Sequence, residues 1–245
     1  IRRKIEGGFE KDIINLADRH IFVTKSNRDD YLNSYNIPKE KTFILTRGYD
    51  EKAYEKIKST VPAEKINKDK INFIYAGEIF SKLRNTNPFV EALKILEKRD
   101  PESFKKLNVL FFGNIDNEGM KKNLVDVTIV DVSPRIPYDK AISYMLNGDV
   151  LMIFGNKNSR QIPAKIYDYF GADGIIFVIL GDENDPILDV VRDKEKCIVV
   201  NNSPEEIVGG IYKIFNHLDN EDKFNPLKEY KWENISGKLN DILKG

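Results

Sequence analysis

Short apolar runs rich in β-branched residues recur along the chain, and this repetition is the strongest constraint on its fold. Most of the runs are continuous rather than alternating between apolar and polar residues, which is typical of strands covered on both faces, as in a parallel sheet. The runs are Ile21–Val23, Phe43–Leu45, Ile71–Ala76, Val109–Phe112, Val127–Val132, Val150–Phe154, Ile175–Leu180 and Ile198–Val200.

Amphipathic segments with helical spacing lie between these runs. Phe89, Leu93 and Leu96, for example, fall on one face of a helix. Strands that alternate with helices form right-handed βαβ units. The sequence therefore predicts an α/β fold with an open, doubly wound parallel sheet of the Rossmann-like kind.

A change of pattern near residue 60 predicts a domain boundary. The stretch 61–70 is rich in Lys, contains Pro62 and has no apolar period, so we interpret it as a connector. Trp232 and Ile235 open a final amphipathic segment. We expect residues 1–60 to be the end of one domain, 61–231 to be the main domain and 232–245 to be a terminal helix.

The overall charge and residue counts exclude several classes of protein. The 245 residues include 39 Lys+Arg and 39 Asp+Glu, so the formal net charge of 0 argues against a nucleic-acid-binding protein. One Cys and two His exclude an internal disulfide and the usual Cys/His zinc site, so we expect no metal and no cofactor. No apolar run approaches the roughly 20 residues that span a bilayer. Because the chain begins Ile1-Arg2-Arg3-Lys4 without a signal peptide, we expect a cytoplasmic protein whose beginning is missing.

Common nucleotide-binding and hydrolase motifs are absent from the sequence. There is no G-x-x-x-x-G-K-[ST], no G-x-G-x-x-G after a strand and no G-x-S-x-G. The sequence therefore lacks the main evidence for a P-loop nucleotidase, a dinucleotide-binding domain or an α/β-hydrolase.

Three polar segments follow predicted strands, at the end of the sheet where open α/β proteins bind ligands. In the first, a strand ends at Gly77, Lys82 and Arg84 lie in the loop, and a helix starts near Asn87-Pro88. Glycine lets the backbone approach a ligand closely, and Arg can donate two hydrogen bonds to a phosphate.

The second segment runs from Ser159 and Arg160 to Ala172, and Pro163 suits the first turn of a helix. Lys165 would lie in that turn, near the positive end of the helix dipole, where an anion relieves the unfavourable charge. Asp168 follows one turn later and can accept hydrogen bonds from sugar hydroxyls. The third segment, 132–141, leaves a strand and enters a helix through Ile136-Pro137.

These segments, in this order, resemble the donor-binding domain of retaining GT-B glycosyltransferases of the large fourth family, the glycosyl transferases group 1. The resemblance extends over nearly the whole chain. The similar segments are Ala17–Thr24, Thr46–Asp50, Ile74–Arg84, Pro137–Met145, Gly148–Leu151, Ile162–Tyr169 and Trp232–Ile235.

The resemblance implies that Arg84 and Lys165 hold the diphosphate of a nucleotide-sugar donor, that Asp168 contacts the ribose and that Ile136-Pro137 lines the nucleobase. It places Glu78 where many members have a second phosphate-binding Arg, where its charge would repel a diphosphate unless the side chain turns away or pairs with Lys82. Arg160 falls near the first Glu of the family's E-x7-E pattern.

The resemblance also implies the function and partners of the whole protein. It implies transfer of a sugar from a nucleotide-diphosphate sugar to a glycan or lipid-linked glycan. This chain would supply the donor-binding half, an acceptor-side domain would be its partner, and the full-length enzyme would associate peripherally with a membrane. Two alternatives stay open: a sugar-nucleotide epimerase of the GT-B type, and a non-catalytic module that binds nucleotide sugars.

Overall fold

The computed structural model describes residues 2–158, 161–220 and 224–244 of the chain, and they fold as two compact units. One unit comprises residues 1–49 and 228–245, and the other is the continuous stretch 50–227. No helix among the described residues is both long enough and apolar enough to cross a membrane.

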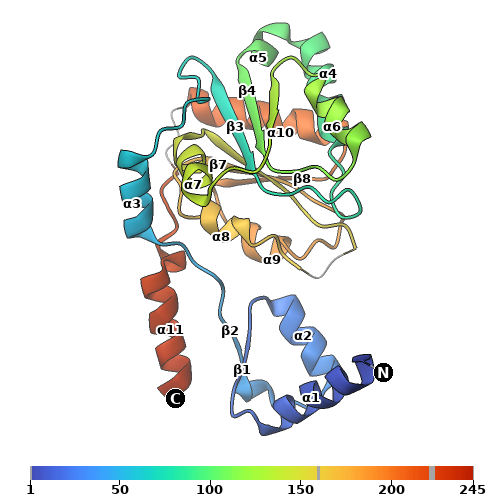
Figure 1. Cartoon of the computed structure of the whole chain (residues 1–245), viewed down its shortest axis with the longest axis vertical. Helices are drawn as coiled ribbons and strands as arrows, with labels where there is room; N and C mark the ends of the chain where they lie inside the picture. Colours follow the sequence, from blue (N-terminus) through green and yellow to red (C-terminus); the bar gives the residue numbers. More distant parts are fainter. Residues whose placement is uncertain (1, 159–160, 221–223, 245) are drawn as a thin grey trace. The chain divides into compact units, whose positions relative to one another are not determined.

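The larger unit, 50–227, contains a parallel sheet of six strands (Figure 1). Its order is β5-β4-β3-β6-β7-β8, and every pairing is parallel. The strands are β3 (Ile71–Ala76), β4 (Leu107–Phe112), β5 (Val130–Ser133), β6 (Val150–Phe154), β7 (Ile175–Ile179) and β8 (Cys197–Val200). This architecture confirms the expected doubly wound α/β fold.

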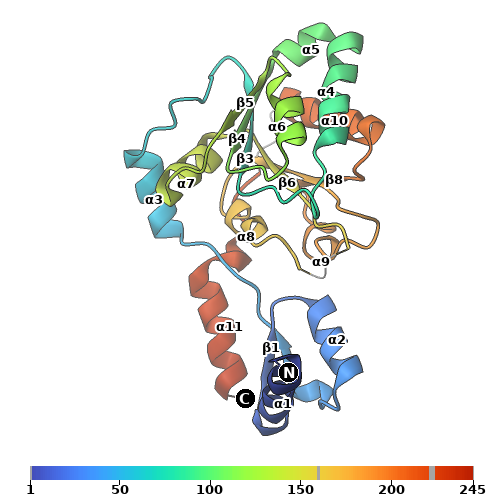
Figure 2. The same ribbon diagram turned by 45° about the vertical axis from the view of Figure 1, so that its right-hand side comes forward.

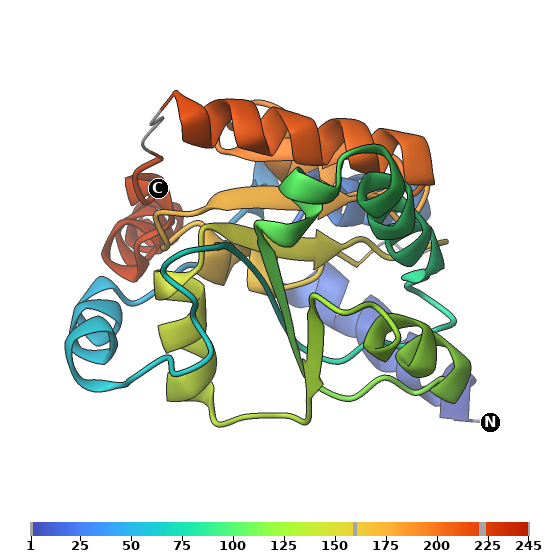
Figure 3. The same ribbon diagram turned by 90° about the horizontal axis from the view of Figure 1, so that it is seen from above.

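Helices cover both faces of this sheet. The helices are α3 (Glu51–Thr60), α4 (Asn87–Arg99), α5 (Pro101–Lys105), α6 (Glu118–Val125), α7 (Tyr138–Asn147), α8 (Lys165–Tyr169), α9 (Leu188–Val191) and α10 (Pro204–Asp219). Figures 1 and 2 show α3 beside α7, and the two helices are in contact. Figure 3 shows α4 and α10 on the opposite side of the sheet from α7.

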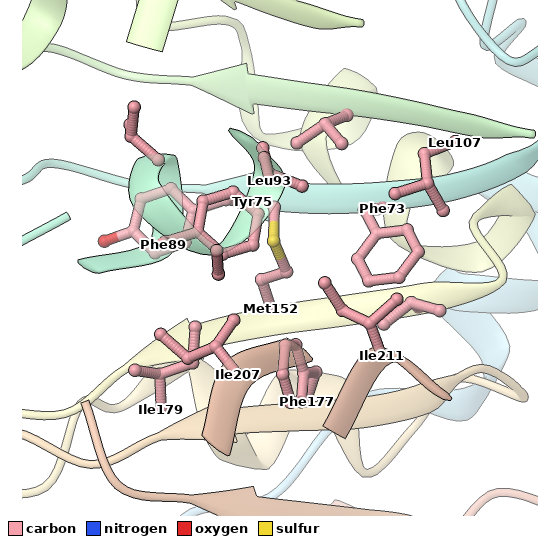
Figure 4. Packing of buried hydrophobic residues seen from close by; sticks show 14 of the residues in the cluster. Phe73, Tyr75, Phe89, Leu93, Leu107, Met152, Phe177, Ile179, Ile207 and Ile211 are labelled. Carbon is pink, nitrogen blue, oxygen red and sulfur yellow. The ribbon is translucent and has the colours of Figure 1, made fainter. Parts of the chain in front are cut away.

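The main core lies between the sheet and the helices α4, α6 and α10. Figure 4 shows five members of this core, Phe73, Met152 and Phe177 of the strands, Phe89 of α4 and Ile207 of α10, with Phe89 beside Tyr75 and Ile207 near Phe177. All five side chains are at most 1% exposed. The alternate strand residues Ile74, Leu151 and Ile176, which point to the other face, are also fully buried. The central strands are therefore buried on both faces, as their continuous apolar pattern predicts.

The smaller unit contains a two-stranded parallel sheet and the last helix of the chain. Its elements are α1 (Arg2–Leu16), β1 (His20–Phe22), α2 (Lys25–Ser34), η1 (Lys39–Lys41), β2 (Thr42–Ile44), η2 (Lys228–Tyr230) and α11 (Trp232–Lys244). Tyr49 N–H donates to Tyr230 O at 2.9 Å, and Trp232 N–H donates to Tyr49 O at 3.0 Å. These bonds join the C-terminal segment to the N-terminal one, so the helix expected as a separate terminal piece belongs to this unit.

The division between the units differs from the boundary expected near residue 60. It falls between Tyr49 and Asp50, so the helix α3 belongs to the larger unit. The Asp50 carboxylate caps α3 by accepting from Ala53 N–H at 3.0 Å. Lys58 of α3 forms an ion pair with Asp173 at 3.0 Å. The sequence pattern missed this because an amphipathic helix carries no sign of which sheet it covers.

Candidate functional site

The centre of the six-stranded sheet contains the point where its strand order reverses. From β3 the chain adds β4 and β5 on one side, and from β6 it adds β7 and β8 on the other. Open α/β sheets bind ligands beyond the carboxyl ends of the strands at such a point. The loops after β3 and β6 carry the first two polar segments identified in the sequence, so the topology brings these segments together.

Gly77 directly follows β3 and has a backbone conformation that L side chains rarely adopt, with φ +152°. A Cβ on Gly77 would lie 2.3 Å from Nζ of Lys165. Gly113, after β4, has φ +143°, and its Cβ would lie 2.2 Å from the Gly77 carbonyl oxygen. The two glycines therefore allow the strand ends to pack closely and allow an ammonium group to rest against the backbone.

Lys165 is the first residue of α8, and its ammonium group is completely covered. Nζ lies 3.8 Å from the centre of the Tyr75 ring, an arrangement that favours a cation. Within the described part of the chain, this nitrogen has no hydrogen-bond acceptor. Burial lowers the pKa of Lys165; the charge of Arg84 lowers it further, while Tyr75 and Asp168 oppose the shift. A buried cation without an acceptor is costly, and an anionic ligand would compensate it.

Arg84 lies at the other end of the loop that Gly77 opens. Its Nη1 donates to the Glu78 carbonyl oxygen at 2.7 Å, and Tyr75 Oη donates to the same oxygen at 3.0 Å. Its Nε is buried and has no acceptor among the described residues. The two cations therefore lie close to the end of the same strand, β3. Arg84 donates to the Glu78 carbonyl oxygen, and the ammonium of Lys165 lies against Gly77 and the Tyr75 ring. Two like charges so placed suit a dianionic group such as a diphosphate.

Asp168 is half-buried on α8, one turn beyond Lys165. Its Oδ1 accepts a hydrogen bond from Oη of Tyr54 at 3.1 Å. Tyr54 comes from α3 and is 4% exposed. Sequence reasoning missed this residue because α3 was assigned to the other domain.

A pocket of about 290 Å³ lies beside Gly77, at the carboxyl ends of β3 and β4. Its lining residues are Ala76, Gly77, Glu78, Phe112, Arg135, Ile136, Tyr138 and Ala141. Ile136 thus lines this pocket, whereas Pro137 is exposed and precedes the first residue of α7. A larger hollow of about 860 Å³ lies in the smaller unit, lined by residues of α1, β1 and α2, and contains no predicted site residue.

The structure gathers Gly77, Glu78, Arg84, Lys165 and Asp168 at the carboxyl ends of β3 and β6. Lys82 is exposed and forms no ion pair with Glu78 in the part of the chain that the structure describes. Its charge contributes to lowering the pKa of Asp116, an effect led by hydrogen bonding from Ser81. Ser159 and Arg160 lie outside the described residues.

One argument from the sequence needs correction. The helix α8 has only five residues, so its dipole is too short to attract a phosphate by itself. The charge of Lys165 and its burial are the features that favour an anion here. Over the described residues, no group of three or more His, Cys, Asp or Glu side chains could hold a metal ion.

Comparison of the sequence with protein-family models and with curated proteins found no match. Solved structures do match in fold. A glycosyltransferase from Rickettsia africae has a TM-score of 0.70 at 15% identity, over 97% of this chain and 68% of that one. A UDP-forming α,α-trehalose-phosphate synthase from Burkholderia xenovorans has a TM-score of 0.67 at 10% identity, over 93% and 61%.

The UDP-GlcNAc 2-epimerase of Neisseria meningitidis, solved bound to UDP-GlcNAc, also matches, with a TM-score of 0.56 at 15% identity, over 93% and 61%. At these identities the likeness concerns the fold, which is that of Rossmann-like GT-B proteins. The chain spans about three fifths to two thirds of the lengths of these proteins.

Proposed function

We propose that residues 50–227 bind a nucleoside-diphosphate sugar as the donor in a glycosyl-transfer reaction. The observation that carries the proposal is the covered ammonium of Lys165, beside Arg84, at the point where the strand order reverses. The proposal is supported by the solved glycosyltransferases that share this fold.

In this proposal Lys165 and Arg84 bind the diphosphate, and Gly77 leaves room for it beside the backbone. Cleavage of a sugar–phosphate bond develops negative charge on the leaving nucleoside diphosphate. Two fixed cations stabilise that charge because they need no reorganisation as it forms. Asp168 would accept hydrogen bonds from ribose hydroxyls, and Ile136 would contact the nucleobase from the pocket wall.

The remaining parts of the proposal concern the whole protein. The acceptor would be a glycan or a lipid-linked glycan, and residues 1–49 with 228–245 would form part of an acceptor-side domain. Because the fold is shared by proteins that differ in their reactions, the identity of the sugar and of the base is a matter for experiment.

Calorimetry with UDP, GDP and ADP tests the proposal on the protein itself. We expect one of them to bind, and Lys165→Ala or Arg84→Ala to weaken that binding at least about tenfold, since each variant removes a charged contact. Lys82→Ala is the matched control, because Lys82 is an exposed cation in the same loop. Unchanged affinity in both the Lys165 and the Arg84 variants would refute the donor site.

An epimerase is the second candidate, because a UDP-GlcNAc 2-epimerase shares the fold. Product analysis separates the candidates. An epimerase changes the free nucleotide sugar in the absence of an acceptor, whereas a transferase needs one. A non-catalytic module binds the nucleotide sugar and leaves it unchanged under both conditions.

A further inference from the structure

Tyr54 is a buried residue of α3 whose hydroxyl group contacts the helix α8. Helix α3 packs against α7, and Tyr54 Oη extends from it to Oδ1 of Asp168 on α8, at 3.1 Å. The ring is 4% exposed, so the phenol occupies a closed site rather than a solvent-facing one.

The surroundings of Tyr54 keep its hydroxyl protonated. Burial raises the pKa of Tyr54 far above its usual range, and the Asp168 carboxylate and the Tyr138 hydroxyl raise it further. The phenol therefore acts as a hydrogen-bond donor to Asp168 at every pH at which the protein would be studied. A donor held in this way sets the rotation of the carboxylate about its Cβ–Cγ bond.

Asp168 has two neighbours that make its orientation matter. Its charge acts on the covered ammonium of Lys165. Tyr54, which donates to it, also interacts with Tyr138, a residue that lines the 290 Å³ pocket. A carboxylate can accept hydrogen bonds from hydroxyl groups only when its oxygens face them. A small rotation of the carboxylate would misdirect those hydrogen bonds.

We propose that Tyr54 is a positioning residue that holds the Asp168 carboxylate in the orientation needed to accept hydrogen bonds from the ribose hydroxyls of the donor. This role rests on the proposed function, since it presupposes that a nucleotide binds there. A merely structural role would require only the volume of the ring, which phenylalanine supplies equally well. The hydroxyl is therefore the atom to test.

Calorimetry on the full chain can test the hydroxyl with Tyr54→Phe. The probes are UDP, 2′,3′-dideoxy-UDP, which lacks the ribose hydroxyls, and inorganic pyrophosphate. Where GDP or ADP binds the wild type more tightly than UDP, that nucleotide and its dideoxy form replace the uridine pair. Tyr212→Phe is the matched control, because Tyr212 lies on α10 and packs against Phe215, away from Asp168.

We expect Tyr54→Phe to weaken binding of the ribonucleotide about three- to tenfold, the effect of one lost hydrogen bond. Binding of the dideoxy form and of pyrophosphate should not change. Adding Tyr54→Phe to Asp168→Asn should produce no further loss, because Tyr54 acts through Asp168. Tyr212→Phe should change none of these affinities.

With the three probes, the positioning role is overturned by no loss with the ribonucleotide or by an equal loss with all of them. An additive effect in the double variant also overturns it, since Tyr54 would then act independently of Asp168. These failures are distinguishable from failure of the proposed function, which is seen when no nucleotide binds the wild type or when Lys165→Ala and Arg84→Ala leave binding intact. If the proposed function fails in this way, the positioning role of Tyr54 is refuted as well.

Discussion

Two lysines of the larger unit have buried ammonium groups, but their surroundings differ. Lys196 immediately precedes β8 and is 2% exposed, and its Nζ donates to the Ala172 carbonyl oxygen. Nζ of Lys165 is also covered, yet it lies on a tyrosine ring and a glycine backbone, with no acceptor among the described residues.

The difference separates a cation with a structural partner from a cation suited to a ligand. Protein interiors usually supply partners for buried charges, because an uncompensated charge costs several kcal/mol. Lys196 follows that rule through one carbonyl oxygen. Lys165 does not follow the rule, because its ammonium has no acceptor among the described residues. A second cation, Arg84, further lowers the pKa of Lys165. Burial alone thus does not distinguish the two lysines, and the lack of an acceptor at Lys165 is the feature on which its proposed role rests.

The largest expected effect is a difference in nucleotide binding between variants of the two buried lysines. Lys165→Met should weaken binding of the nucleoside diphosphate about a hundredfold or more, the usual cost of losing one preorganised charge at a reacting group. Lys196→Met should leave that binding unchanged. Calorimetry on both variants checks this. A similar loss of affinity in the two would contradict the proposal that Lys165 binds the diphosphate directly.

Gly77→Ala should have the next largest effect. The new Cβ would collide with Nζ of Lys165, and the residue would be strained at φ +152°. Together these should cost roughly 1–3 kcal/mol of stability, and the displaced ammonium should also weaken binding. Urea unfolding measures the first effect and calorimetry the second.

Gly209→Ala is the matched control for Gly77→Ala. Gly209 is exposed inside α10, and its Cβ would meet nothing within 4 Å. This substitution should stabilise the protein by roughly 0.5–1 kcal/mol, because alanine favours helices over glycine. Equal effects at the two positions would show that the space around Gly77 is not restricted.

A smaller effect concerns the pH dependence of stability at Lys196. Burial lowers the pKa of Lys196 from its ordinary 10.5 to about 8 in the folded protein. Between these values the unfolded state binds more protons, so stability rises with pH, by at most about 1.4 kcal/mol per pH unit. Below the folded value both states are protonated and the effect is constant.

Urea unfolding of wild type and Lys196→Met at about pH 7 and about pH 9 measures this dependence. The wild type should gain stability relative to the variant on going to the higher pH. The pH range ends at about 9 because of the Cys197 thiol, whose pKa is raised by burial from its ordinary 9.0 to about 12. Above pH 9 this thiol makes the stability of the protein fall as pH rises. A constant difference between wild type and variant would contradict the lowered pKa.

The smallest effect is proton uptake at Lys165. Its pKa is lowered in the free protein, and a bound diphosphate would raise it, so binding takes up a fraction of a proton at alkaline pH. Affinity should then fall as pH rises, by at most about tenfold per pH unit. Calorimetry at about pH 8.5 in buffers of different ionisation enthalpy measures the uptake, and Lys165→Met should abolish it.

The sequence predicted the parts of the fold that depend on local pattern. The runs Ile71–Ala76 and Val150–Phe154 coincide with β3 and β6, and the helix start at Asn87-Pro88 is the start of α4. Continuous apolar runs and a proline near a helix start are determined by neighbouring residues, which explains this success.

The strand order could not be predicted in the same way, and the site depends on it. That β3 lies beside β6 brings Gly77 to Lys165, a contact between residues that no local pattern relates. Tyr54 was missed for the same reason, since it lies 114 residues before Asp168. Lys165 and Lys196 also look alike as isolated charges in the sequence, because the presence of an acceptor is a property of the folded chain.

The pairing of Tyr49 with the segment around Lys231 has a practical consequence. Residues 50–227 are one uninterrupted insertion into a unit whose own two pieces meet at these residues. The larger unit can therefore be expressed alone from one continuous gene fragment that encodes residues 50–227. Any shortening of the polypeptide at its carboxyl end, in contrast, removes part of the unit formed by its first residues.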